Sequence, residues 1–119
     1  MQTLPALPRR YHRSLATVAL TGLLLLPAAR AADPEVTLVI RGHKFEPTEL
    51  KVPANQRIKL IVHNQDTTPE EFESKRMKSE KVVPAGAKVT IWLGPLKPGR
   101  YEFVGEYHEA SAKGVVIAE

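Results

Sequence analysis

The chain of 119 residues contains no cysteine. Without a thiol there is no disulfide, no cysteine nucleophile and no thiolate ligand for a soft metal ion. A small domain without disulfides must take its stability from its apolar core, with a bound metal ion as the other possible contributor. The absence of cysteine therefore excludes thiol chemistry and leaves metal binding by oxygen and nitrogen donors open.

The signatures of several enzyme classes are also missing. No glycine-rich stretch has the spacing of a phosphate-binding loop. Ser74, Ser79 and Ser111 lack the elbow and the neighbouring His and Asp of a hydrolase nucleophile. Paired carboxylates for glycoside hydrolysis would need a carbohydrate groove, for which a short chain has little room. We find no hydrolytic or transferase site in the sequence.

The first 31 residues have a composition of their own. Three arginines in PRRYHR precede the uncharged apolar run SLATVALTGLLLLP, and the small residues of AARAAD follow. This order predicts a signal peptide over residues 1–31, cleaved after Ala31. The run is shorter than the about 20 residues that a membrane span needs, so we expect no direct insertion in a membrane. The expected mature protein is residues 32–119.

Cleavage would remove the net charge of the chain. Of the 17 Lys and Arg residues, four lie in the leader, which leaves 13 against the 13 Asp and Glu residues that follow it. A nucleic-acid-binding protein needs a basic face. We therefore expect no nucleic-acid partner.

Apolar residues after the leader alternate with period two, which is typical of half-buried strands. Turn signals, VPANQ, VPAGAK and GPLKPGR, separate the runs. The pattern predicts an all-β sandwich or barrel in one domain. The exception is Ser74–Lys81, whose mixed charges indicate a loop or a short helical turn. The expected inward residues are Val36, Leu38 and Ile40; Ile58, Leu60 and Val62; Val89, Ile91 and Leu93; Tyr101 and Phe103; and Val115 and Ile117 or their neighbours.

Three segments carry a family resemblance. They are HKFEPTELKVPANQRIKLIVHNQD, TPEEF and PGRYEFVGEYHEASAKG. Taken in this order they resemble the cupredoxin family, the small proteins that hold blue copper. The resemblance implies a cupredoxin-like Greek-key β-sandwich of about seven to eight strands over residues 32–119.

The resemblance also implies that the blue-copper ligands have been replaced. Glu70 stands at the place of the first copper histidine, Gly105 at the copper cysteine and Ala112 at the axial methionine, and His108 alone is retained. A type 1 copper centre needs a thiolate. The resemblance therefore implies a site without type 1 copper.

Acidic residues gather around these positions, and the family's ligand loops meet at one end of the sandwich. Carboxylates with imidazoles suit iron or Cu(II) better than Cu(I). If Phe72 points into the core, Glu70 points into the metal end, and Glu71 and Glu73 face the other side of the strand. The expected ligands of an iron or copper ion are His108, Glu70, Glu71, Glu73, Glu80 and His43.

Three further side chains have simpler interpretations. His63 shares a face with two basic residues and is expected on the surface of a strand. Met77 is expected to pack over the end of the sandwich. Trp92 is expected to point outward, over a sheet face or toward a partner.

The stretches EEFES, EKVVPAG and GEYHE are similar to cysteine-less cupredoxins of bacterial iron-uptake systems. Those proteins accompany a periplasmic iron-binding protein and a membrane iron permease. The resemblance implies a periplasmic protein that assists ferrous-iron oxidation or handover, with an accessory ferroxidase activity left open. Two alternatives remain, a periplasmic copper chaperone or buffer and a metal-free docking module.

Overall fold

The computed structural model describes residues 1–8, 21–26 and 31–119, and the predicted signal peptide falls largely outside them. Among the described residues, all nine strands lie between Glu35 and Ala118, and no helix is long and apolar enough to cross a membrane. The strands are β1 (Glu35–Arg41), β2 (Lys44–Glu46), β3 (Glu49–Val52), β4 (Ile58–Asn64), β5 (Glu70–Ser74), β6 (Ser79–Val83), β7 (Lys88–Leu93), β8 (Gly99–Gly105) and β9 (Lys113–Ala118), with a 3-10 turn, η1 (Glu106–His108), between the last two.

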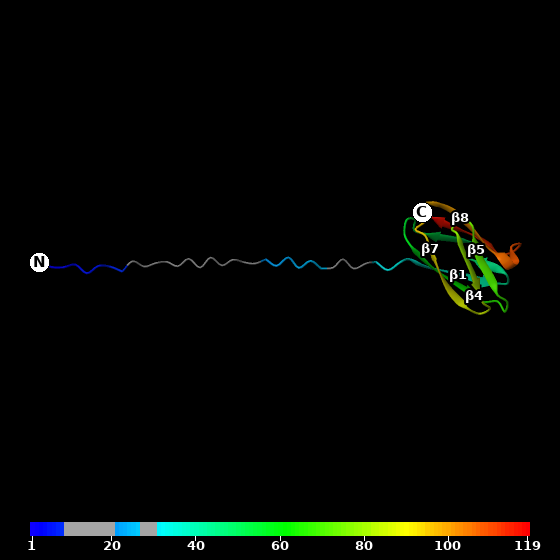
Figure 1. The fold of residues 1–119 in the computed structure, drawn as a ribbon, viewed down its shortest axis with the longest axis horizontal. Helices are drawn as coiled ribbons and strands as arrows, with labels where there is room; N and C mark the ends of the chain where they lie inside the picture. The colour runs from blue at the N-terminus through cyan, green and yellow to red at the C-terminus, as the bar shows by residue number, and fades with distance from the viewer. Residues whose placement is uncertain (9–20, 27–30) are drawn as a thin grey trace.

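The strands form the two layers of a sandwich (Figure 1). One sheet has the order β2-β1-β4-β7 and the other the order β3-β9-β8-β5-β6. β1 and β4 pair in parallel, as do β3 and β9, and the remaining pairs are antiparallel. The expected all-β sandwich is confirmed, with nine strands instead of about seven to eight.

The core lies between the sheets and follows the predicted alternation. In β4 the inward residues Ile58, Leu60 and Val62 are fully buried. In β9 the neighbours of the named residues, Val116 and Ala118, are the buried ones. Three aromatic rings fill the centre and meet with centroids 5.0 to 6.4 Å apart. They are Phe45, Phe72 and Phe103.

The expectation of a loop or helical turn over Ser74–Lys81 is wrong in part. β5 runs to Ser74 and β6 begins at Ser79, so only the four residues between them form a turn. The Ser74 hydroxyl donates to the carbonyl of Glu102 (2.7 Å). Because β6 is an edge strand with exposed side chains, backbone pairing defines it while its side chains show no apolar alternation.

A buried asparagine shapes the connection that leads into β5. The Asn64 side-chain amide donates to the carbonyls of Thr68 (2.9 Å) and Val83 (3.1 Å), and its oxygen accepts from the Asp66 amide (3.0 Å). Asn64 is fully buried, and these hydrogen bonds take the place of the hydrogen bonds to water that its side chain loses on burial. The loop between β4 and β5 is thereby fixed, and Glu70 enters the sheet at a defined position.

Candidate metal centre

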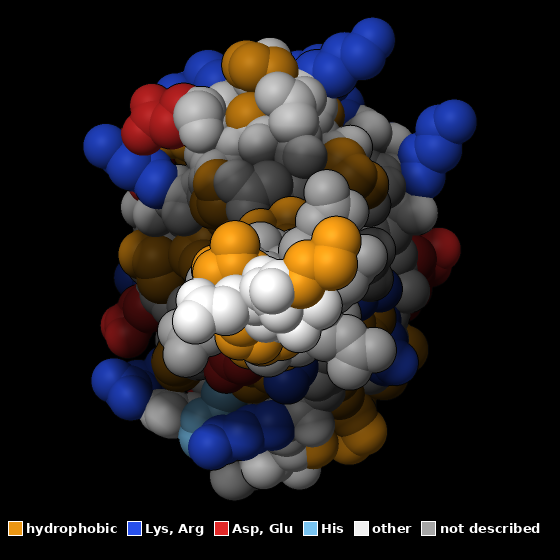
Figure 2. All heavy atoms as spheres, turned by 90° about the vertical axis from the view of Figure 1, so that its left-hand side faces the viewer, with side chains coloured by type: hydrophobic (Ala, Val, Ile, Leu, Met, Phe, Trp, Pro, Cys, Tyr) orange, Lys and Arg blue, Asp and Glu red, His pale blue; other side chains and the backbone are white. Residues whose placement is uncertain are grey.

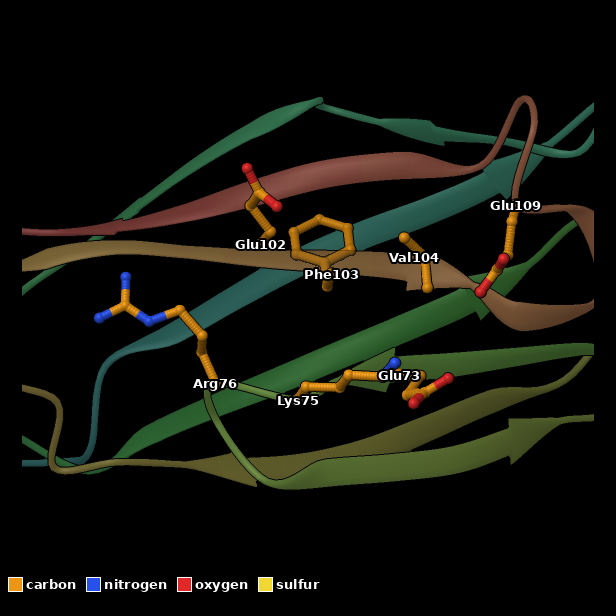
Figure 3. A pocket seen from close by; sticks show the side chains of 7 residues that line it. All are labelled: Glu73, Lys75, Arg76, Glu102, Phe103, Val104 and Glu109. Atoms are coloured by element: carbon orange, nitrogen blue, oxygen red, sulfur yellow. The ribbon is translucent and has the colours of Figure 1, made fainter.

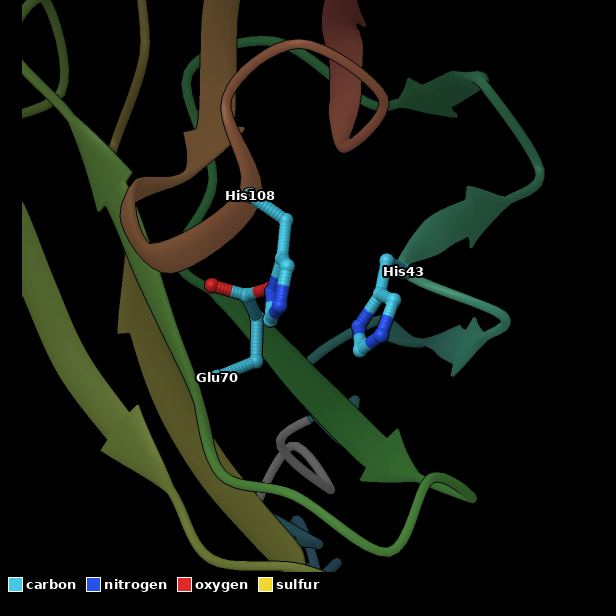
Figure 4. A group of neighbouring side chains, drawn as sticks. All are labelled: His43, Glu70 and His108. Carbon is cyan, nitrogen blue, oxygen red and sulfur yellow. The ribbon is translucent and has the colours of Figure 1, made fainter.

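A buried carboxylate faces an imidazole at one end of the sandwich (Figure 4). Glu70 begins β5 and is only 1% exposed. Its Oε2 lies 2.6 Å from Nδ1 of His108, which ends η1. The sequence predicted this direction for Glu70, because Phe72 two residues later is fully buried on the same face.

The other oxygen of Glu70 holds the backbone of the same loop. Oε1 accepts the amide N–H groups of Tyr107 (2.9 Å) and Glu71 (3.0 Å). The His108 carbonyl in turn accepts the amide of Ala112 (2.8 Å). Both oxygens of the buried carboxylate have partners, so the imidazole of His108 is held in one place.

A second imidazole stacks on the first. His43 lies in the turn between β1 and β2 with φ 55°, and its ring faces that of His108 with centroids 3.6 Å apart and planes 20° apart (Figure 4). The Ser111 hydroxyl donates to the His43 carbonyl (2.6 Å). The backbone of this turn is therefore tied to the loop that carries His108.

Asp66 fixes the backbone of the His43 turn. Its carboxylate accepts the amides of Gly42 (2.7 Å) and His43 (2.9 Å). These bonds, the one from His43 first, hold the pKa of the Asp66 carboxyl below its ordinary value. The ionised carboxylate thus stabilises two consecutive residues with positive φ.

Replacing Asp66 with alanine should cost about 1–2 kcal/mol of folding free energy, since two charge-assisted hydrogen bonds are lost. Because the folded-state pKa is lowered, this contribution is present above about pH 4 and is lost as the pH falls further. Urea unfolding at pH 7 and at pH 3 measures it. An equal difference between wild type and variant at both pH values would contradict the assignment.

Three of the six predicted ligand residues come together. Each of His43, Glu70 and His108 offers one ligand atom, and these atoms lie within 4.8 Å of one another. Two ligands on opposite sides of one ion are roughly 4 Å apart, so the spacing of these atoms is close to what a shared ion needs. The other three predicted residues, Glu71, Glu73 and Glu80, do not lie in this group.

Glu71 and Glu80 instead join Glu106 in a second acidic group. The hydrogen bond with Glu80 is the largest cause that raises the pKa of Glu71, to about 7, with desolvation and the charge of Glu106 next. Desolvation is the largest cause that raises the pKa of Glu73. Glu73 lines a shallow pocket with Lys75, Arg76, Glu102, Phe103, Val104 and Glu109 (Figure 3).

Replacing Glu71 with glutamine should remove a pH-dependent loss of stability. The folded state favours the protonated carboxyl, so its contribution is complete below about pH 4.5 and is lost as the pH rises through about 7. The amide of the Glu71→Gln variant stays neutral, and the melting temperature of this variant should exceed that of wild type at pH 8 by a few degrees while matching it at pH 5. The exposed Glu49→Gln is the control, and an equal gain in that variant would disprove the interpretation.

Sequence reasoning missed two acidic residues that the structure places near the candidate ligands. Asp66 ends the first of the three family-like segments and Glu106 precedes His108 by two residues, and neither is among the expected ligands. Figure 2 shows the end of the molecule away from the site, where Lys and Arg predominate among the visible charged side chains.

The simpler expectations hold for two side chains outside the site. Met77 packs against the core, and Trp92 is 51% exposed beneath the Arg57 guanidinium.

The family of the chain follows from direct comparison. A family model for the cupredoxin-like domain matches residues 14–118, and the chain belongs to this family. An uncharacterised protein of Rickettsia prowazekii (strain Madrid E) is 46% identical over 83 residues, which is 70% of this chain and 66% of that protein. The chain thus spans slightly less than two thirds of this relative.

Solved structures share the fold at low sequence identity. Auracyanin A, a blue copper protein from Chloroflexus aurantiacus, is 13% identical with a TM-score of 0.63, over 74% of this chain and 100% of that one. The metal-binding domain of the Streptococcus pneumoniae D39 Cu(I)-exporting P-type ATPase CopA, solved with Cu(I), is 13% identical with a TM-score of 0.61, over 71% of this chain and 84% of that one. These similarities establish the β-sandwich fold alone. Which residues could bind a metal has to be inferred from the side chains of this chain.

Type 1 copper does not fit the residues present. The chain has no cysteine, and a carboxylate lies beside the imidazole of His108. A set of two imidazoles and one carboxylate fits a harder ion.

Proposed function

We propose that this protein binds an iron or copper ion as cargo at His43, Glu70 and His108 and assists ferrous-iron oxidation or handover. The observation that carries the proposal is the buried Glu70–His108 pair with His43 stacked beside it. A buried carboxylate needs a positive partner. A cation bound by Glu70 and His108 would supply that charge.

The donor set supports iron or Cu(II). Oxygen and imidazole donors are harder than the thiolate of a blue-copper site. The negative charge of Glu70, little screened because of its burial, stabilises the higher oxidation state of a redox ion. The ligands must lose their protons to bind, so affinity should fall in acid.

The second acidic group supports a role in attracting cations to this end of the molecule. Glu71 follows Glu70 in β5 but faces the other side of the sheet, and Glu106 begins η1, so this group lies at the same end of the sandwich as the proposed site. Clustered carboxylates raise the local concentration of cations. Oxidation of Fe(II) needs an electron acceptor, which a partner would have to supply, whereas handover of the ion needs none.

The setting is part of the proposal. The resemblance of EEFES and GEYHE to cysteine-less cupredoxins supports a periplasmic location, a periplasmic iron-binding protein as partner and a membrane iron permease as the receiver of the ion. The apolar run after PRRYHR supports export.

A second candidate function is copper delivery. It is favoured by the fold shared with auracyanin A and with the CopA domain, whose names state copper binding. In this role the protein would bind Cu(II) tightly and respond little to Fe(II).

Titration of the purified protein with Fe(II) under anaerobic conditions, and separately with Cu(II), tests the proposal. Calorimetry gives the stoichiometry, and EPR gives the nitrogen and oxygen coordination of Cu(II). One saturable site for Fe(II) supports iron handling, and a site for Cu(II) alone supports copper delivery. If neither metal binds, the proposed function is wrong and a docking module is the better interpretation.

A further inference from the structure

Gly105 ends β8 immediately before the loop that carries His108. Its backbone has φ −90° and ψ 106°, an extended conformation that any residue adopts. The chain therefore does not need a glycine here for its backbone. The reason for the missing side chain lies in the space around it.

That space is occupied by the Glu70 carboxylate. A Cβ atom at residue 105 would lie 2.7 Å from Cδ and 3.0 Å from Oε1 of Glu70, and 2.7 Å from Cβ of Ala112. All three distances are shorter than a van der Waals contact between these atoms. Any side chain at residue 105, alanine included, requires Glu70 and Ala112, or the backbone of residue 105 itself, to shift.

Neither neighbour has room to withdraw. Ala112 is fully buried, and its carbonyl accepts the amide of Gly105 (2.9 Å). Glu70 is held by Tyr107, Glu71 and His108. Moving its carboxylate would break the contact with His108 and leave a buried charge without partners, which is costly.

We infer that Gly105 is a specificity-determining residue of the metal site. Its empty side-chain position admits the Glu70 carboxylate beside the imidazole of His108 and excludes every other donor from that place, a thiolate included. The site therefore presents oxygen and nitrogen to the ion and selects hard cations. This inference rests on the proposed function and adds the residue that sets the choice of metal.

The first test is a double-mutant cycle with Gly105→Ala, Glu70→Ala and the pair together. Gly105→Ala alone should weaken Cu(II) or Fe(II) binding by about 10–100-fold, the usual effect of disturbing the groups around a metal ligand. In the Glu70→Ala background the same change should alter affinity less than about twofold, because the clash with the carboxylate is then absent and only the one with Ala112, which is not a ligand, remains. Val104→Ala, one residue earlier in β8, is the control and should bind as wild type does.

Thermal unfolding without metal follows the same cycle. Gly105→Ala should lower the melting temperature, and Glu70→Ala should relieve much of that loss. If Gly105→Ala does not fold, a folded double variant supports the shared space, and a double variant that also fails to fold contradicts it.

The second test is selectivity. The double variant Glu70→Ala with Gly105→Cys exchanges an oxygen donor for sulfur, and competition between Cu(I) and Fe(II) should shift toward Cu(I) by at least about tenfold. An unchanged preference would overturn the inference. If wild type binds metal and Gly105→Ala binds equally well, only this inference fails. If wild type binds no metal, the proposed function fails and the inference with it.

Discussion

Replacing His108 with alanine should weaken binding of Cu(II) or Fe(II) by at least about 100-fold. Disturbing only the groups around a ligand costs about 10–100-fold, so removing the best-held imidazole costs at least the upper value. Glu70 would remain at the site, but its Oε2 would lose the partner 2.6 Å away. A buried carboxylate without that partner is a poorer site and a less stable one.

The matched control is His63→Ala. His63 lies in β4 on the outer face of the other sheet, pairs with Lys88 of β7 and is no member of the candidate group. Metal titration by calorimetry compares the two variants with wild type, and circular dichroism verifies that both fold. Equal affinity in His108→Ala and wild type would place the ion elsewhere, with the acidic group of Glu71, Glu80 and Glu106 the next position to test.

Period-two alternation predicted an all-β sandwich or barrel and also the direction of Glu70, whereas the cupredoxin-like arrangement was implied by the family resemblance. Strand parity is a local property, and Phe72 is a large apolar residue whose burial could be foreseen. The same rule placed Glu71 and Glu73 on the opposite face, which is where the structure has them. The prediction that Glu71 and Glu73 bind the same ion as Glu70 and His108 did not take this into account. Residues on opposite faces of a strand are separated by the sheet.

Other features of the site depend on contacts that no sequence pattern reports. His43 has a positive φ, and its backbone amide donates a hydrogen bond to Asp66, which lies more than twenty positions away in the sequence. The role of Gly105 is visible only once Glu70 and Ala112 are seen against it. The sequence of edge strand β6 has no apolar alternation, and the strand forms because its backbone pairs with β5. This is why the sequence pattern did not predict it.

The two acidic arrangements differ in a way that bears on chemistry. Glu70 is buried and both of its side-chain oxygens have hydrogen-bond partners, so the carboxyl group is held in one place facing His108. Glu71 is only partly buried and is surrounded by other carboxylates, which raise its pKa. A rigid donor suits specific binding, whereas exposed and mutually repelling carboxylates suit transient attraction of cations.

Replacing Phe103 with alanine should destabilise the fold by about 3–5 kcal/mol, the usual cost of removing a fully buried phenylalanine. Its ring meets those of Phe45 and Phe72 with centroids 5.0 and 5.2 Å away. Since small domains are stable by about 5–15 kcal/mol, the loss is a large part of the total. It also loosens β8, the strand that leads through Gly105 to His108.

Gly114 gives this prediction an independent check. A Cβ atom there would lie 2.3 Å from Cζ of Phe103, so the glycine makes the room that the ring fills. Gly114→Ala should therefore destabilise wild type by about 1–3 kcal/mol, the cost of overpacking, and should cost much less in the Phe103→Leu background. Urea unfolding of the four proteins measures the coupling. Equal costs of Gly114→Ala in both backgrounds would mean that the contact with Phe103 does not decide the need for glycine at this position.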